Sequence, residues 1–344
     1  MLSLQPDLAG LRRPPLRKTK LGAFCAAWVL LSISATVTGH SQIQPSSPTS
    51  NPIKAEELQL YANARPYPDQ PSEQLKKTVH ELRDLTPSSS QDQLPGILAK
   101  TAAEADELLH KLPDLISDEA VSEIQWSVPH SDVAGCIGDG CEQYSTGRRA
   151  EKNQKFSYII LAHRNQYGQL QLDEYRAGRN GKPIPGGSAG PRFQGFIETW
   201  LVFSSLNQAE SRFRYLGAEK TDGHDTFVVG FEQIPGEVIY PGQYQSQQHS
   251  VPMLLQGIAW IDQSDFRIVR LRTDLLAPLP QVNLQAQTSN IMFGPVNVAG
   301  SELWLPATVD IAMQAEGQFL QEKHRYSQYR LYQAKSRIIL PSDN

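Results

Sequence analysis

The sequence predicts an α+β protein: one large antiparallel β-sheet, with helices from an N-terminal segment and from residues 193–212 packed on it. Two observations support this fold class. From Lys155 onward, runs of alternating apolar and polar residues are separated by short turn signals, as in antiparallel hairpins. No helical pattern separates these runs regularly, so a parallel sheet built from βαβ units is disfavoured. The 344 residues, of which 40% are hydrophobic, are enough for a sizeable core.

Residues 55–125 are predicted to form a helical segment, because apolar residues recur there at intervals of three and four. Pro87 and the serines after it separate a first helix from a second, and Pro113 ends the second. The same spacing appears within residues 193–212. We expect all three stripes to contact the sheet. They consist of Leu75, Val79, Leu82 and Leu85; of Leu94, Ile97, Leu98, Ala102, Ala105, Leu108, Leu109 and Leu112; and of Phe196, Trp200, Phe203 and Leu206.

The β domain is expected to span residues 126–340 as a meander of hairpins. Asn165–Gly168, Asp222-Gly223 and Asp262–Asp265 carry residues that favour turns between strands. The expected strands are Phe156–Arg164, Leu170–Ala177, Arg214–Lys220, Thr226–Glu232, Leu254–Asp262, Arg267–Asp274, Val282–Phe293, Leu303–Ala315 and Phe319–Gln333.

The N-terminus is typical of an export signal. A basic stretch precedes an apolar run from Leu21 to Val37, and small residues follow it, so residues 1–41 are predicted to be a signal peptide cut after Gly39 or Ser41. An uncleaved anchor is the alternative, since the run is just long enough to span a membrane. Residues 42–54 are rich in proline and serine and are expected to form a flexible tether. The predicted location is therefore the periplasm or cell envelope.

Cysteine usage agrees with export. Cys25 lies within the apolar run, which leaves Cys136 and Cys141 in a short glycine-rich loop. In an oxidising compartment, such a pair is expected to form a disulfide. Free thiols and half of a metal site are the alternatives, and a metal site would need two more ligands nearby.

Charge and motifs argue against several function classes. Residues 1–40 carry five basic residues and one acidic residue, so the remainder holds a net charge of −8 out of the total of −4, which disfavours nucleic-acid binding. The sequence has no nucleophile elbow, zinc-protease motif, phosphate loop or dinucleotide fingerprint. We therefore expect neither a cofactor nor a metal, and no enzymatic activity, with a hydrolase as the least favoured reading. The basic and aromatic residues around His324 are explained by a strand with a solvated face.

Large apolar residues on the predicted strands are the candidates for binding an apolar ligand. A broad curved sheet with an apolar face could hold a lipid or an acylated peptide. The alternative is that the same residues form only the protein core under the helices. The candidates are Phe227, Val229, Phe231, Trp260, Phe293, Trp304 and Met313.

One hairpin resembles a known family. The segments Gly257-Ile-Ala-Trp-Ile-Asp262 and Phe266-Arg-Ile-Val-Arg270 are similar to a hairpin of the periplasmic lipoprotein-carrier superfamily. That superfamily includes outer-membrane lipoprotein carriers, lipoprotein-sorting proteins and envelope-stress regulators. The likeness to this superfamily covers residues 150–335 in the order and style of the strands. The whole chain is also similar to secreted bacterial proteins, a likeness that implies no activity.

The resemblance implies a half-open antiparallel β-barrel with helices over its concave side, and a lipid or lipoprotein as partner, with association at a membrane surface. Two features depart from the family pattern. The helical segment 55–125 is larger than a plain carrier needs, and the loop that contains Cys136 and Cys141 has no counterpart in it.

Overall fold

The computed structural model describes residues 53, 55–127, 149–164, 170–178, 181, 184, 193, 196–197, 199–239, 241–245 and 250–333. The predicted signal peptide, most of the predicted tether, and the Cys136–Cys141 pair lie outside these residues. Cleavage, tethering and the disulfide therefore stay predictions.

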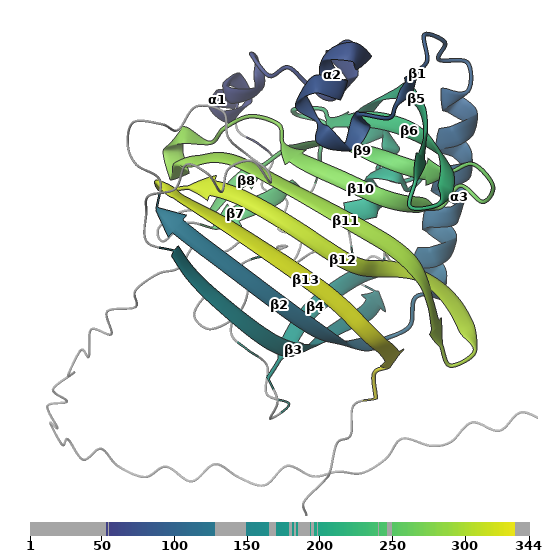
Figure 1. Ribbon diagram of the computed structural model, residues 1–344, viewed down its shortest axis with the longest axis vertical. Helices are drawn as coiled ribbons and strands as arrows, with labels where there is room; N and C mark the ends of the chain where they lie inside the picture. The colour runs from purple at the N-terminus through teal and green to yellow at the C-terminus, as the bar shows by residue number, and fades with distance from the viewer. Residues whose placement is uncertain are drawn as a thin grey trace, which may run out of the picture. The chain divides into compact units, whose positions relative to one another are not determined.

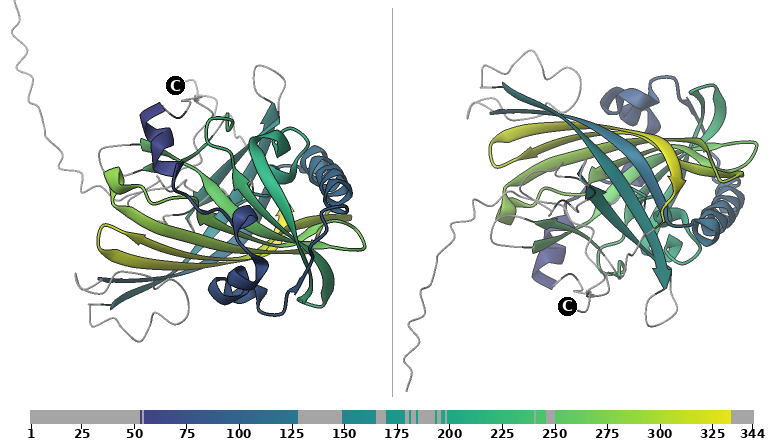
Figure 2. Two further views of the ribbon diagram at one scale, coloured as in Figure 1. Left: turned by 90° about the horizontal axis from the view of Figure 1, so that it is seen from above. Right: turned by 90° about the horizontal axis from the view of Figure 1, so that it is seen from below.

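One antiparallel sheet of eleven strands dominates the fold, and Figure 1 shows its long strands side by side. Its order is β1-β5-β6-β9-β10-β11-β12-β13-β2-β3-β4, so β1 and β4 form its edges and it does not close. Its strands curve, as Figure 2 shows. The strands are β1 (Thr86–Pro87), β2 (Leu115–Ser127), β3 (Arg149–Arg164), β4 (Leu170–Ala177), β5 (Ser211–Thr221), β6 (His224–Gln233), β9 (Leu255–Asp262), β10 (Ile268–Leu275), β11 (Leu284–Val298), β12 (Ser301–Ala315) and β13 (Gln318–Leu331).

The remaining elements are short apart from one helix. A separate hairpin pairs β7 (Gly242–Gln245) with β8 (Ser250–Met253). The helices are α1 (Ala55–Leu58), α2 (Ser72–Thr78) and α3 (Leu94–Lys111), and the 3-10 turns are η1 (Gln59–Tyr61), η2 (Tyr67–Asp69), η3 (His80–Leu82), η5 (Thr199–Phe203), η6 (Gln208–Glu210) and η7 (Pro280–Val282). The predicted class is confirmed: an open, mostly antiparallel sheet with a few helices.

Two of the three predicted turns are confirmed. The third, Asn165–Gly168, lies outside the described residues, although the strands on either side of it, β3 and β4, pair antiparallel. Asp222 and Gly223 both have positive φ, at 50° and 90°, as the tight turn between β5 and β6 requires. The Asp262 carboxylate accepts a hydrogen bond of 2.6 Å from the Ser264 backbone N–H, so it caps the turn between β9 and β10. Gly257 is needed for packing, because a Cβ there would lie 2.6 Å from the Phe231 ring.

The helical prediction is wrong for residues 115–125, which belong to β2. This strand pairs with β13 on one side and β3 on the other, so it is central in the sheet. Its inward positions include Ser117 and Glu119, both fully buried. Because these inward side chains are polar, the two-residue alternation of the strand does not show in the hydrophobic pattern.

The helix predicted for residues 193–212 is also wrong. The described part of this segment forms two 3-10 turns, η5 and η6, and β5 begins at Ser211. Phe196, Trp200 and Phe203 are buried as expected, but Leu206 is 77% exposed. The apolar spacing therefore identified the buried residues correctly but did not identify the backbone conformation.

The sheet buries side chains on both of its faces. We call the face that carries Val229, Ala259, Leu271, Ile291 and Val309 the inner face. It holds the main hydrophobic cluster, to which residues of α3 and Phe193, Phe196, Ile197, Trp200 and Phe203 also belong. The opposite, outer face carries a second cluster. In it, Tyr67, Leu75, Val79, Leu82 and Leu85 from the N-terminal segment cover Leu216, Val228, Ile258, Trp260 and Val269.

Ionic and polar contacts hold the N-terminal segment on the outer face. Glu81 accepts two hydrogen bonds from Arg272, at 3.0 and 2.9 Å, and a third from Asn290 at 2.9 Å. The Tyr67 hydroxyl donates to Asp274 at 2.8 Å. Burial opposes ionisation of Glu81, but Arg272 and the other donors outweigh it and lower the pKa of Glu81. The outer face over β5, β6, β9 and β10 is thus closed by the chain itself.

Candidate functional site

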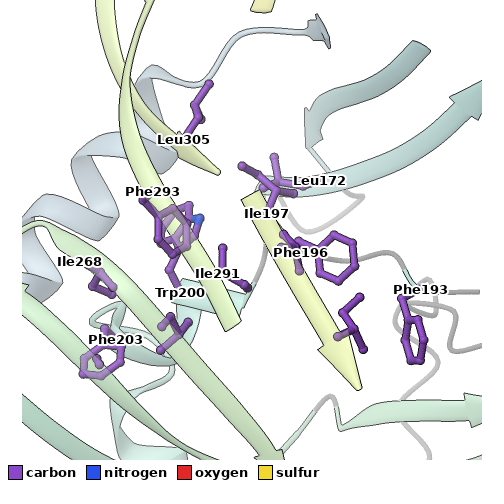
Figure 3. Packing of buried hydrophobic residues seen from close by; sticks show 14 of the residues in the cluster. Leu172, Phe193, Phe196, Ile197, Trp200, Phe203, Ile268, Ile291, Phe293 and Leu305 are labelled. Atoms are coloured by element: carbon purple, nitrogen blue, oxygen red, sulfur yellow. The ribbon is translucent and has the colours of Figure 1, made fainter. Parts of the chain in front are cut away.

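The segment formed by Phe196, Ile197 and η5 lies on the inner face of the sheet. Figure 3 shows its side chains Phe196, Ile197, Trp200 and Phe203 among those of the strands. Phe203 lies against Phe213 and Phe231, with ring centroids 5.2 and 5.6 Å apart. At the other end, Phe196 lies edge-on to His324, with centroids 5.1 Å apart. This segment therefore contacts an apolar half of the inner face at one end and a charged half at the other.

A pocket of about 80 Å³ opens between α3 and the apolar half. Its apolar wall contains Trp200 from η5, Phe293 from β11 and Trp304 from β12. The indole N–H of Trp304 donates to the Ile268 carbonyl at 2.7 Å, which fixes the orientation of that ring. The described residues that line the pocket are Thr101, Glu104, Ala105, Glu107, Leu108, Lys111, Trp200, Phe266, Arg267, Ile268, Phe293, Glu302, Leu303 and Trp304.

The charged residues of this pocket are paired with one another. Arg267 lies 3.6 Å from Glu104 and 3.3 Å from Glu302, and its guanidinium is 5.6 Å from the centre of the Trp304 ring. Lys111 pairs with Glu107 one turn earlier on α3. Each cation that lines the pocket therefore has a carboxylate partner.

Two of the residues that line the pocket each carry a buried polar atom without a partner. Among the described residues, neither Thr101 Oγ1 nor Trp200 Nε1 makes a hydrogen bond. Thr101 is 1% exposed and Trp200 is 3% exposed, so bulk water does not satisfy them. An unsatisfied buried polar group costs about 1–3 kcal/mol, and such groups need an explanation where they occur.

The seven sequence-derived candidates divide among three places. Phe293 and Trp304 line the pocket. Phe227, Val229, Phe231 and Met313 lie in or against the main cluster of the inner face and do not line the pocket. Trp260 is fully buried on the outer face, under the N-terminal segment. The structure thus brings two of the seven together at a pocket.

The charged half of the inner face holds a buried ionic cluster. Arg176 from β4 donates two hydrogen bonds to Glu119 of β2, at 2.6 and 2.7 Å. His324 of β13 lies 2.9 Å from Glu119 and 3.1 Å from Glu322 through its two ring nitrogens. The Tyr326 hydroxyl donates to Glu119 at 3.0 Å. All of these side chains are buried.

Ile197 contacts the same half through Glu174 of β4. The Glu174 carboxylate accepts the Ile197 backbone N–H at 3.1 Å, and it also accepts the hydroxyl of Tyr158. Burial raises the pKa of Tyr158 well above its usual value, so this hydroxyl stays a donor. The charged half therefore anchors one end of the segment.

The electrostatics of the cluster favour its ionised form. Burial alone would raise the pKa of Glu119. The charge of Arg176 and the hydrogen bonds that Glu119 accepts outweigh burial and lower this pKa to about 2. Burial alone would lower the pKa of His324, but its hydrogen bonds to Glu119 and Glu322 outweigh burial and raise it. Among the described residues, no group of three or more His, Cys, Asp or Glu could hold a metal ion. The cluster is thus a set of mutually compensating charges.

Sequence reasoning missed this cluster. The hydrophobic pattern predicts a helix around Glu119, but Glu119 lies on β2 and is buried. The sequence also predicts that His324 lies on a strand with a solvated face, but His324 is buried as well. One signal was available: Glu322, His324 and Tyr326 alternate in phase with the apolar Leu320, which lies in the core. The pairing of β13 with β2, which brings His324 opposite Val121 and so close to Glu119, has no such local signal.

Comparison with known proteins finds similar solved structures, but their sequence identities and TM-scores are low. No protein-family model and no curated protein matches the chain. A DUF1329 family protein from Desulfovibrio piger is 13% identical, covering 72% of this chain and 96% of its own, with a TM-score of 0.33. An outer membrane lipoprotein-sorting protein domain from Vibrio parahaemolyticus is 15% identical, covering 70% and 95%, with a TM-score of 0.31.

The lipoprotein LppX of Mycobacterium tuberculosis is 12% identical, covering 68% of this chain and 95% of its own, with a TM-score of 0.23. Likeness at these TM-scores is too low to support a conclusion about activity. Within the described residues, no helix is both long enough and apolar enough to cross a bilayer.

Proposed function

We propose that this chain is an exported, non-enzymatic cell-envelope protein that binds an apolar ligand, such as a lipid or an acyl chain, between α3 and the inner face of the sheet. The observation that carries this proposal is the pocket, with its aromatic wall of Trp200, Phe293 and Trp304. Ligand sites are typically concave and mostly apolar, with a few placed polar groups. Export is supported by the N-terminal signal pattern.

The pocket must widen to take a whole ligand. Its volume of about 80 Å³ is well below the roughly 300–1,000 Å³ that small-molecule sites occupy. The wall formed by α3 carries the short side chains Thr101 and Ala105. Since α3 is not part of the sheet, it can shift without breaking the hydrogen bonds between strands.

A structural or partner-binding envelope protein without a ligand is the second candidate. A specific observation favours it: Phe196, Ile197, Trp200 and Phe203 fill much of the inner face with the chain's own side chains. In that reading, the pocket is a packing defect at the edge of the core. The two candidates differ in whether an apolar probe occupies the pocket.

A pocket-blocking variant separates them. The delipidated mature protein is titrated with the neutral fluorescent probe N-phenyl-1-naphthylamine, whose emission rises in an apolar site. Leu108 lines the pocket from α3, so Leu108→Trp fills it, and we expect probe affinity to fall about tenfold, which equals about 1.4 kcal/mol.

The matched control is Ala103→Trp, which adds a large side chain at an exposed position of the same helix and should leave the affinity unchanged. Thermal unfolding of both variants checks that they fold. If the folded wild type fails to bind the probe, or if both variants bind it as the wild type does, the pocket is not a ligand site and the structural reading stands.

A further inference from the structure

The turn between β9 and β10 connects the sheet to α3 at the pocket. Phe266 and Arg267, the last two residues before β10, both line the pocket, and both contact the helix. Lys100 Nζ lies 4.4 Å from the centre of the Phe266 ring. Glu104, one helical turn further along α3, has a carboxylate oxygen 3.6 Å from Arg267 Nε. Two adjacent residues of the turn therefore contact two residues on one side of the helix.

Hydrogen bonds fix the backbone of this turn. The Asp262 N–H donates to the Arg267 carbonyl at 2.9 Å, and the Phe266 N–H donates to the Asp262 carbonyl at 3.0 Å. Phe266 has a φ of 61°, a left-handed conformation that is unfavourable for a bulky aromatic residue. Such conformations persist only where the surroundings enforce them, and they are concentrated at ligand clamps and switch regions. The turn is thus a rigid support for Phe266 and Arg267.

Arg267 joins the helix to the sheet beside the aromatic wall of the pocket. Its guanidinium lies 5.6 Å from the centre of the Trp304 ring and 3.3 Å from Glu302 of β12, while its Nε faces Glu104 of α3. The Arg267 and Glu104 side chains are 34% and 36% exposed. An ion pair between partly exposed side chains is weak, so this bridge can open at little cost.

We infer that Phe266 and Arg267 form a latch that holds α3 closed over the pocket, and that a ligand enters when Glu104 and Lys100 leave it. This inference rests on the proposed function and adds the regulation of its site. The volume of about 80 Å³ is too small for a whole ligand, so the latched form is the closed form.

The latch has an effect on affinity of unusual sign. A ligand that binds only the open form loses apparent affinity in proportion to the fraction of molecules that are closed. Weakening the latch should therefore tighten binding, although it removes an interaction from the pocket wall. Weakening a contact that only shapes the wall should leave binding unchanged or loosen it.

Glu104→Gln tests the latch, because it removes the charge that faces Arg267 and keeps the size of the side chain. The delipidated mature protein is titrated with N-phenyl-1-naphthylamine, which is neutral and so responds little to the charge of the variant. We expect about threefold tighter binding than in the wild type, and a similar gain in the association rate measured by stopped flow. Lys100→Met removes the cation from the Phe266 ring and should tighten binding about twofold. Unchanged or weaker binding in Glu104→Gln overturns the inference.

The matched control is Asp106→Asn, which removes the same charge from the same helix at a residue that does not line the pocket. Asp106 accepts a hydrogen bond from the Ser205 N–H at 3.3 Å, and the asparagine oxygen can keep it. We expect wild-type affinity. An equal gain in this variant would trace the effect to the charge of α3 and would also overturn the latch.

Ionic strength gives a second readout. Raising it from about 0.01 M to about 0.15 M shortens the Debye length from about 30 Å to about 8 Å and so weakens exposed ion pairs. The wild type should bind the neutral probe about twofold more tightly at the higher ionic strength, and Glu104→Gln should not change. Parallel responses of the two proteins contradict the latch.

The outcomes separate this inference from the proposed function. If the probe binds and Leu108→Trp blocks it, but Glu104→Gln binds no more tightly than the wild type, the ligand site stands and the latch is wrong. If the wild type binds no probe, both the site and the latch fail. Because Glu104 is partly exposed, Glu104→Gln should stay folded, which thermal unfolding checks.

Discussion

The two halves of the inner face bury their side chains by different rules. In the apolar half, Phe203, Phe213 and Phe231 pack through van der Waals contacts, which depend little on direction. A pocket lies beside Trp200 and Phe293 in this half. In the charged half, Glu119 needs Arg176 and His324 at hydrogen-bonding distance, because a buried charge without a partner is costly. An opening for a ligand is therefore expected in the apolar half, where a side chain can move without stranding a charge.

The largest effect should come from breaking the charged half. Glu119→Ala leaves Arg176 buried without its bidentate partner, and we expect it to lower the free energy of unfolding by about 3–5 kcal/mol, near the upper end of that range. Urea unfolding measures the loss. Asp118→Ala is the control: this neighbour on β2 pairs with Arg330 and is half exposed, so its loss should cost less than about 1 kcal/mol. Equal losses would mean that the cluster is not a closed set of buried charges.

The next effect sharpens the distinction between a core tryptophan and a pocket tryptophan. Trp260→Ala removes a fully buried indole from the outer face, so we expect a loss of about 3 kcal/mol in stability and unchanged probe affinity. Trp304→Ala, at the pocket, should cost about 1 kcal/mol, because this side chain is only partly buried, and it should weaken probe binding clearly. Weaker probe binding in Trp260→Ala would show that the outer face takes part in the site.

The smallest effect is the pH dependence of stability that the charged half contributes. The raised pKa of His324 means that its contribution is fully present below about pH 6.5 and is lost as pH rises through the value of the folded protein. The lowered pKa of Glu119 means that its contribution is present above pH 4.5 and is lost as pH falls toward about 2. Both contributions are complete between pH 4.5 and 6.5.

His324→Gln isolates the alkaline part of this dependence. Wild type and variant are unfolded in urea at several pH values from 5 to 9. The wild type should lose stability above pH 6.5 by more than the variant does, because only the wild type has an imidazolium at position 324 to deprotonate. Parallel curves above pH 6.5 would show that His324 is neutral in the folded protein.

The apolar half was the more predictable from sequence. Phe227, Val229 and Phe231 recur at every second position, so their strand and their shared face could be read directly, and all three lie in or against the main cluster. The Asp222-Gly223 turn set the register of that hairpin locally. Trp260 also lies on a predicted strand, but which face of the sheet it occupies depends on what covers that face.

The sequence by itself determined the fold class, the antiparallel strands and most of their turns, since these follow from alternation and turn chemistry over a few neighbouring residues. Only the tertiary structure decided that residues 115–127 form a central strand, that Glu119 meets Arg176 and His324, and that Thr101 shares a pocket with Trp200. The physical reason is distance along the chain. Partners on β2, β4 and β13, or on α3 and η5, come together only when the whole sheet and its cover assemble, and a buried polar residue shows no hydrophobic pattern to announce it.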